Sequence, residues 1–306
     1  MRNPLIAFIL LIFLSGCASL TESQQQVVTD YAKATQSYAD YPGVLIRKYA
    51  DLREEISLLR SPMNTNPKVA ATRIQELYKG KKMLLKKAEK LDLTFKILKA
   101  YAKNLEILAT TDYADNLKNS SNELALNIDS LTSMYNRSFD TNMPKGFGEV
   151  MAKTIQFVGT RKLNHDRAEL VKEYVVKGDT LIATFSGIAK QFLEQKVEQE
   201  WLAGLDDHLK NEHELIRTLL SSDKQHYPLV SYNVMLIDGK VAGLYEEIDS
   251  LRKLCKSLKS SIENISTVHK SVMKSIQEKR KIDVLTKELV IFINDAHNLA
   301  EIVESK

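Results

Sequence analysis

The chain has 306 residues, with 43 Lys or Arg against 39 Asp or Glu, and its net charge at pH 7 is +4. Apolar residues make up 44% of the sequence, and there are only 11 Gly and 6 Pro. This composition is typical of a globular protein and excludes collagen-like, low-complexity and fully disordered chains. The chain breakers are also too few for an all-β sandwich, which needs a turn about every ten residues.

The first sixteen residues predict a signal peptide. Arg2 precedes an uninterrupted apolar run over residues 5–14. A run of this length suits the hydrophobic region of a signal peptide, and it is too short for a transmembrane helix, which needs about 20 residues. We therefore expect residues 1–16 to be a targeting segment that is removed from the mature protein.

The segment that follows the apolar run is Leu14-Ser15-Gly16-Cys17. It resembles the lipobox of bacterial lipoproteins, in which an aliphatic residue and two small residues precede a Cys. The resemblance implies cleavage after Gly16, a diacylglyceryl group on Cys17 and acyl chains such as palmitate. It also implies an anchor in the outer membrane facing the periplasm, because Ala18 rather than Asp follows the Cys. The alternative is an ordinary secretory signal that happens to end in Cys.

The mature chain, residues 17–306, is expected to form a single domain on a short membrane tether, residues 17–21. Thr21-Glu22-Ser23-Gln24 has the pattern of a capping box, which predicts that the first helix begins there. Cys255 is the only other cysteine. With Cys17 acylated, no intramolecular disulfide can form, so the fold must be stabilised by burial.

Apolar residues recur at alternating spacings of three and four along most of the chain. The series extend from Leu45 to Leu59, from Leu84 to Ala109, from Leu244 to Ile276 and from Ile282 to Leu299. The second of them extends backward through Ala70, Ile74 and Leu77, with Lys81 as its one polar interruption. A repeat of 3.5 residues is typical of helices that pack side by side at a shallow angle. The predicted fold is all-α, an elongated bundle of long antiparallel helices with coiled-coil-like packing.

Local signals predict where these helices begin and end. Asn66-Pro67 predicts the start of a helix that extends to about Thr110. Breaks are expected at Pro42-Gly43 and Ser61-Pro62. The remaining predictions are a helix from Asp112 to Phe139, a loop at 140–148, an apolar helix at 150–158, an amphipathic helix to about Leu220, a loop at 221–233 around Pro228, and a slip in the apolar repeat near 279–281.

Two kinds of candidate site fall on these helices. His208 and Glu212 are one helical turn apart and could supply two ligands to a metal ion. No third ligand at helical spacing is evident, so we expect an exposed acidic turn there. Cys255 and His269 both fall on the apolar repeat, and we expect each to be a packed core residue.

Basic residues are concentrated in two stretches. Residues 68–103 carry a net charge of +8, and residues 252–281 carry +7. Such runs are usually solvated helix faces, but they could also bind an anionic partner such as phospholipid headgroups, lipopolysaccharide or a cell-wall polymer. Nucleic acid is not expected, since aromatic residues do not alternate with the basic ones. The outer heptad positions that would form this surface are Lys82, Lys86, Lys90, Lys96, Lys103, Lys256, Lys270 and Lys274.

The sequence contains no nucleophile elbow, phosphate loop or dinucleotide fingerprint. We therefore expect no enzymatic activity and no cofactor. The expected function is a scaffold or adaptor that binds another envelope protein through helix faces. One alternative is a membrane-active helical protein resembling pore-forming toxins, which would insert residues 150–158. The other is a metal- or ligand-binding bundle around His208 and Glu212.

The middle of the chain resembles uncharacterised helical lipoproteins of bacteria in a motif of low specificity. The residues concerned are Phe95–Ala109 and Gly146–Val158. This resemblance implies no activity, substrate or site.

Overall fold

The computed structural model describes residues 20–60, 66–110, 167–222, 227–278 and 282–304. Almost all of these residues are helical, and no strand occurs among them, so the all-α prediction is confirmed. The helices are α2 (Glu22–Tyr38), α3 (Pro42–Leu58), α4 (Pro67–Ala109), α7 (Arg167–Gln191), η2 (Phe192–Leu202), α8 (Ala203–Ser222), α9 (Tyr227–Glu278) and α10 (Ile282–Glu304).

Several predictions concern residues outside the described part of the chain. They are the signal peptide and Cys17, the break at Pro62, the helix at 112–139, the loop at 140–148 and the apolar segment at 150–158. The membrane-active alternative depends on this last segment. Of the helices that are described, none is both long enough and apolar enough to cross a bilayer.

The first helix begins as its capping box predicts. The Thr21 side chain accepts a hydrogen bond from the Gln24 backbone N–H at 3.2 Å, and Gln24 Oε1 accepts one from the Thr21 backbone N–H at 3.0 Å. Gln24 is also buried, and its Nε2 donates to the Ser275 carbonyl oxygen at 3.2 Å. The cap therefore joins the start of α2 to the last turns of α9.

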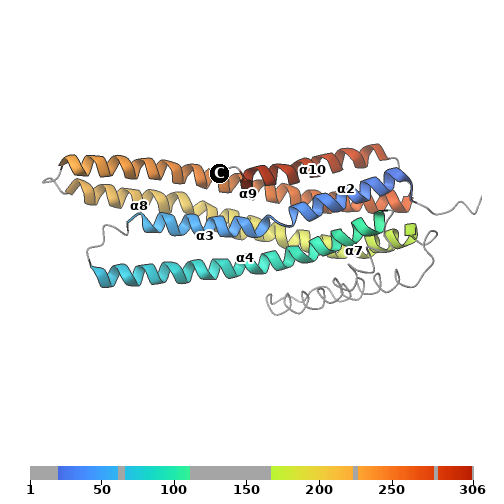
Figure 1. The fold of residues 1–306 in the computed structure, drawn as a ribbon, viewed down its shortest axis with the longest axis horizontal. Coiled ribbons are helices and arrows are strands. Elements are labelled where there is room, and N and C mark those ends of the chain that lie inside the picture. Colours follow the sequence, from blue (N-terminus) through green and yellow to red (C-terminus); the bar gives the residue numbers. More distant parts are fainter. Residues whose placement is uncertain (1–19, 61–65, 111–166, 223–226, 279–281, 305–306) are drawn as a thin grey trace, which may run out of the picture.

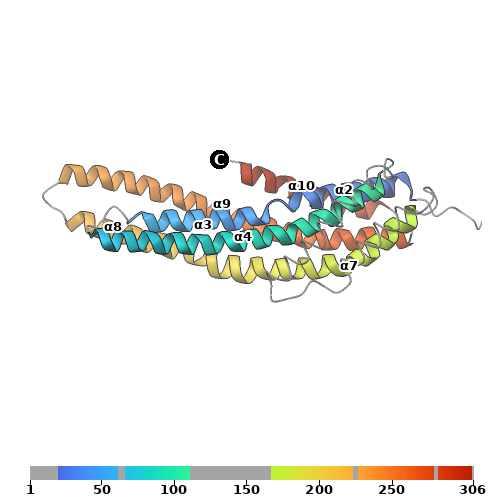
Figure 2. The same cartoon turned by 60° about the horizontal axis from the view of Figure 1, so that its bottom comes forward.

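The bundle is elongated because its two longest helices span it lengthwise (Figure 1). α4 has 43 residues and α9 has 52, which corresponds to about 65 Å and about 78 Å at 1.5 Å per residue. α2 and α3 lie one after the other along α4, and the break between them is at the predicted Pro42 (Figures 1 and 2).

Each long helix contributes its predicted apolar repeat to one continuous core. Every member of the series from Leu244 to Ile276 on α9 is buried. On α4 the repeat is buried from Leu84 onward except at Leu91, which is partly buried, whereas Ile74, one of its earlier members, is half exposed. Lys81, which interrupts this repeat, forms ion pairs with Asp51 and Glu54 of α3 at 2.7 and 2.6 Å.

The loop predicted at 221–233 is wrong at both ends. α8 continues to Ser222 and α9 begins at Tyr227, so Pro228 lies in the first turn of a helix. The first turn accepts proline because its backbone N–H groups have no partner within the helix. The slip predicted near 279–281 lies outside the described residues. α10 packs along α9, where Ser271 contacts Glu288 and Asn264 contacts Asp295.

The bundle has two distinct ends (Figure 1). At the proximal end, α2 begins close to the last turn of α9. At the distal end, α3 and α8 finish and α4 and α9 begin. We use these two names below.

Candidate functional site

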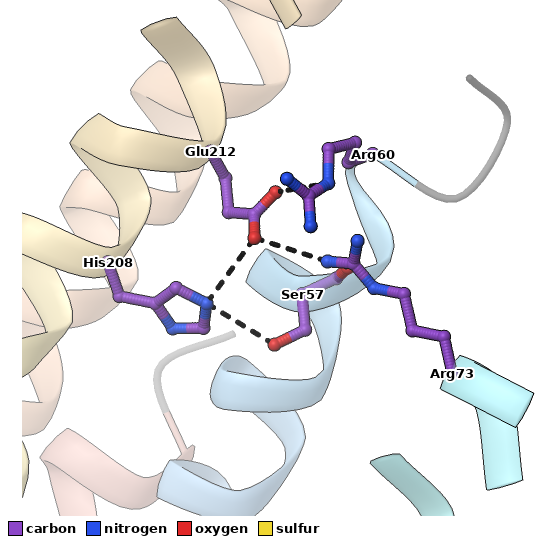
Figure 3. A network of polar contacts seen from close by, with 5 residues as sticks. All are labelled: Ser57, Arg60, Arg73, His208 and Glu212. Carbon is purple, nitrogen blue, oxygen red and sulfur yellow. Dashed lines mark hydrogen bonds and ion pairs between the residues drawn. The ribbon is translucent and has the colours of Figure 1, made fainter. Parts of the chain in front are cut away.

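Five polar residues meet near the distal end, where α3, α4 and α8 come together (Figure 3). Glu212 and His208 lie on α8, Arg73 lies on α4, Ser57 lies on α3, and Arg60 follows the end of α3. We call this group the Glu212 cluster. It joins α8 to two helices, α3 and α4, that come much earlier in the sequence.

A buried carboxylate lies at the centre of the Glu212 cluster. Glu212 is only 8% exposed, and Arg73 Nη2 lies 3.1 Å from its Oε1. Arg60 Nε lies 3.3 Å from Oε2, in an ion pair without the alignment of a hydrogen bond. Arg73 Nη2 also donates to the Ser57 carbonyl oxygen at 2.8 Å. Two guanidinium groups thus offset the cost of burying one carboxylate.

His208 lies at the edge of the cluster. Its Nε2 is 3.4 Å from Ser57 Oγ and 3.9 Å from Glu212 Oε1. Burial lowers the pKa of His208, and the nearby charges of Arg53, Arg73 and Arg60 lower it further, although the Glu212 carboxylate acts in the opposite direction. The neutral imidazole is therefore the favoured form in the folded protein.

The surroundings of His208 and Glu212 suit an ion-paired junction better than a metal ion. The two arginines occupy both oxygens of the carboxylate and would repel a divalent cation. Within the described part of the chain, no three His, Cys, Asp or Glu side chains are placed to hold a metal. The prediction of an exposed acidic turn is wrong for Glu212, because this residue is buried on α8. Sequence reasoning missed Arg60 and Arg73, which no local pattern links to α8.

A second polar network lies in the core of the proximal half. His269 is fully buried, its Nε2 lies 2.8 Å from Tyr101 Oη, and its Nδ1 lies 3.3 Å from Asp179 Oδ1. An ionised carboxylate only accepts, so Nδ1 donates to Asp179, and in the neutral imidazole with this tautomer Nε2 accepts from the Tyr101 hydroxyl. The hydrogen bond from His269 lowers the pKa of Asp179. The expectation that His269 is a partnered core residue is confirmed.

Tyr101 is held in this network from two further sides. Its ring stacks on that of Tyr174 with centroids 5.0 Å apart, and the Tyr174 hydroxyl donates to the Tyr101 carbonyl oxygen. Burial raises the pKa of both phenols. A Cβ at Gly178 would lie 2.4 Å from Tyr101 Oη, so only glycine allows α7 to approach this ring. These contacts hold the Tyr101 side chain in one position within the core.

The remaining core candidate, Cys255, is buried as expected. Burial raises the pKa of its thiol to about 12, so the reactive thiolate is scarce at neutral pH.

A π-helix, η2, links α7 to α8 and was not expected from the sequence. Its last turn carries Trp201, which is buried and stacks on Tyr49 with centroids 5.0 Å apart. Phe192 meets the same indole edge-on, and Lys87 Nζ lies 5.2 Å from the ring centroid. Through the contact of Trp201 with Tyr49, η2 packs against α3. Lys87 of α4 adds a cation–π contact with the same indole.

The predicted basic residues do not form one surface. Lys82, Lys86, Lys96 and Lys103 are exposed on α4, and the side chain of Lys90 lies outside the described part of the structure. Lys256, Lys270 and Lys274 are exposed on α9. α4 packs chiefly on α2, α3 and α7, whereas α9 packs chiefly on α10, α7, α3 and α8. The two basic stretches therefore lie on helices that are not main packing partners of each other.

Comparison with known protein families, curated proteins and solved structures found no match for the chain.

Proposed function

We propose that this protein is a lipid-anchored envelope lipoprotein that acts as a non-enzymatic scaffold or adaptor. In this proposal Cys17 carries the lipid, and the helical bundle projects from the outer membrane into the periplasm. The observation that carries it is the position of the first helix. The cap residue Thr21 follows Cys17 by four residues, which span roughly 13 Å when extended. A tether this short keeps the proximal end of the bundle beside the lipid surface.

The proposal includes antiparallel, coiled-coil-like packing of the helices. The contacts between α9 and α10 support this arrangement, because positions advance along α10 as they retreat along α9. Ser271 pairs with Glu288, and Asn264 pairs with Asp295 at 2.6 Å. A rigid bundle of this kind offers long side faces for binding another protein.

A non-enzymatic role is supported by how the described polar groups are used. The Glu212 cluster and the His269 network both pair helices with one another, and their charged or hydrogen-bonding atoms face protein partners.

The outer face of α10 is where we propose that the protein partner binds. Val290 and Ile291 are adjacent and about half exposed, whereas Leu289 and Phe292 beside them enter the core. Exposed apolar neighbours on one helix face are characteristic of protein interaction sites. α10 packs chiefly on α9 and α2, which leaves this face unpaired among the described helices.

Crosslinking in intact cells tests this proposal. A photoreactive amino acid at Ile291 should give one covalent adduct with an envelope protein, identified by mass spectrometry. The matched control is the same amino acid at His297, which is exposed elsewhere on α10. Adducts of equal yield from both positions, or none from either, would contradict a docking face on α10.

The anchor is tested separately. Cys17→Ser should abolish acylation and release the protein from the membrane fraction. Unchanged membrane fractionation of this variant would refute the lipobox.

A further inference from the structure

The first half of α4 presents an unusually basic surface at the distal end. Residues 67–87 contain seven basic residues and one acidic residue, Glu76. Three of the basic side chains face other helices, where Arg73 pairs with Glu212, Lys81 pairs with α3, and Lys87 lies over Trp201. The other four are Lys68, Lys79, Lys82 and Lys86, and all four are exposed.

These four lysines form one stripe. They follow one another at spacings of eleven, three and four residues, which are close to whole turns of a helix with 3.6 residues per turn. The stripe points away from α3, because Leu84 and Ala88, which are buried in the core, lie on the opposite side of α4. With residues that the structure describes, none of the four lysines forms an ion pair. Their charge is therefore not neutralised by these neighbours.

Exposed apolar side chains border the stripe on both sides. Val69 and Met83 lie along one edge, and Ile74 and Tyr78 lie along the other. Met83 and Tyr78 are 65% and 62% exposed, which is unusual for side chains of this size. Lysines flanked by apolar and aromatic side chains are typical of helices that lie in the headgroup region of a membrane.

The basic stretch of α9 lacks this combination. Lys253, Lys256, Lys270 and Lys274 are exposed, but no large apolar side chain between residues 252 and 277 is. A polyanionic polymer would need only the charges, which both stretches offer. The apolar borders on α4 favour a lipid surface, where lysines meet phosphates and apolar groups enter the interface.

We propose that the Lys68–Lys86 stripe and its apolar borders bind the surface of an anionic phospholipid bilayer. This inference rests on the proposed function and deepens it, because it gives the anchored bundle a second membrane contact at its distal end. The contact is reversible and electrostatic, and it acts through side chains on one helix face.

A fluorophore at position 78 tests the contact in the full-length protein. Tyr78→Cys is labelled with a polarity-sensitive probe, while Cys255 stays unlabelled because it is buried and its pKa is raised. The labelled protein is reconstituted in phosphatidylcholine liposomes. Phosphatidylglycerol is then supplied either in the same liposomes or in added vesicles. We expect a blue shift with phosphatidylglycerol in at least one arrangement, none with phosphatidylcholine alone, and a loss of the shift at high salt.

Two controls make the result specific. The same probe at Ile188→Cys, an exposed apolar position on α7, should show no shift. Lys79→Glu with Lys82→Glu should weaken the affinity for the anionic lipid by at least about ten-fold, whereas Lys253→Glu with Lys256→Glu should leave it unchanged.

The proposal is overturned if neither lipid arrangement shifts the probe at position 78, or if the probe at 188 shifts equally. It is also overturned if a soluble anionic polysaccharide shifts the probe and phosphatidylglycerol does not, since the partner would then be a polymer. The added-vesicle measurement is repeated on a Cys17→Ser variant that stays in solution and carries the probe at position 78 alone, so it does not depend on acylation. A failure here therefore leaves the Cys17→Ser fractionation result, and the proposed function, standing on their own.

Discussion

Arg73 Nη2 bridges two helices, because it lies 3.1 Å from Glu212 Oε1 on α8 and 2.8 Å from the Ser57 carbonyl oxygen on α3. Its own backbone belongs to α4, so one guanidinium joins three helices at the distal end (Figure 3). The partners are separated by 16 and 139 positions along the chain. This junction stabilises the half of α4 that has the fewest buried apolar side chains.

Removing that guanidinium should weaken the fold. Arg73→Ala leaves the buried Glu212 carboxylate with Arg60 alone, and we expect a loss of about 2–3 kcal/mol in the free energy of unfolding. Urea unfolding followed by circular dichroism measures it. The matched control, Lys79→Ala on the exposed side of the same helix, should change stability by less than about 0.5 kcal/mol. Equal effects of the two variants would show that the junction is not stabilising.

His208 should make stability depend on pH. The pKa of its side chain is lower in the folded protein than the ordinary value of 6.5, so the unfolded chain binds the proton first. Its contribution to stability is therefore present above pH 6.5 and is lost as the pH falls from 6.5 toward the lower folded value. His208→Gln should show a smaller drop in melting temperature over this interval than the wild type. Parallel melting curves for the two proteins would contradict this expectation.

The apolar repeat of α9 should be intolerant of charge. Leu258 is fully buried, and Leu258→Asp should cost several kcal/mol because it buries a carboxylate with no partner. Lys256→Asp, two residues away on the exposed side, is the control and should be nearly neutral. Where the Asp variant does not fold, Leu258→Ala should still cost about 2–5 kcal/mol. An unchanged melting temperature for the Ala variant would rule out a core at this position.

Two glycines on α7 should respond in opposite directions to the same change. Gly178→Ala places a methyl group against the buried ring of Tyr101 and should cost about 1–3 kcal/mol. Among the described residues, a methyl group at Gly187 would meet no side chain and no neighbouring helix within 4 Å, and Gly187→Ala should stabilise α7 by about 0.5–1 kcal/mol. Thermal unfolding measures both variants. Stabilisation by Gly178→Ala would mean that the approach of α7 to Tyr101 is not tight.

The sequence predicts those parts of the fold that depend on neighbours along the chain. The capping box at Thr21, the start of α4 after Asn66 and the buried repeat of α9 all follow from spacings within one or two turns. The partner of Lys81 could not be predicted in the same way, because Asp51 and Glu54 lie on a different helix. The repeat showed only that a polar residue interrupts the core face.

The candidate site was harder to predict than the fold. Whether Glu212 is exposed depends on Arg60 and Arg73, which approach it only once α3, α4 and α8 have packed. The sequence did not predict the π-helix, for a different reason. Its N–H groups bond one carbonyl further back along the chain than in an α-helix, but its buried residues Leu193, Val197 and Trp201 recur every four residues, a spacing that an α-helix also allows.

The hydrogen bond from Gln24 Nε2 to the Ser275 carbonyl oxygen has a mechanical consequence. A pulling force on the chain before Thr21 would act first on the cap of α2. This hydrogen bond would transmit the force to the last turns of α9, the longest helix. α9 would then bear part of the force, so that α2 would not separate from the bundle by itself. The molecule would thereby resist tension at its amino-terminal end, where we propose the lipid anchor.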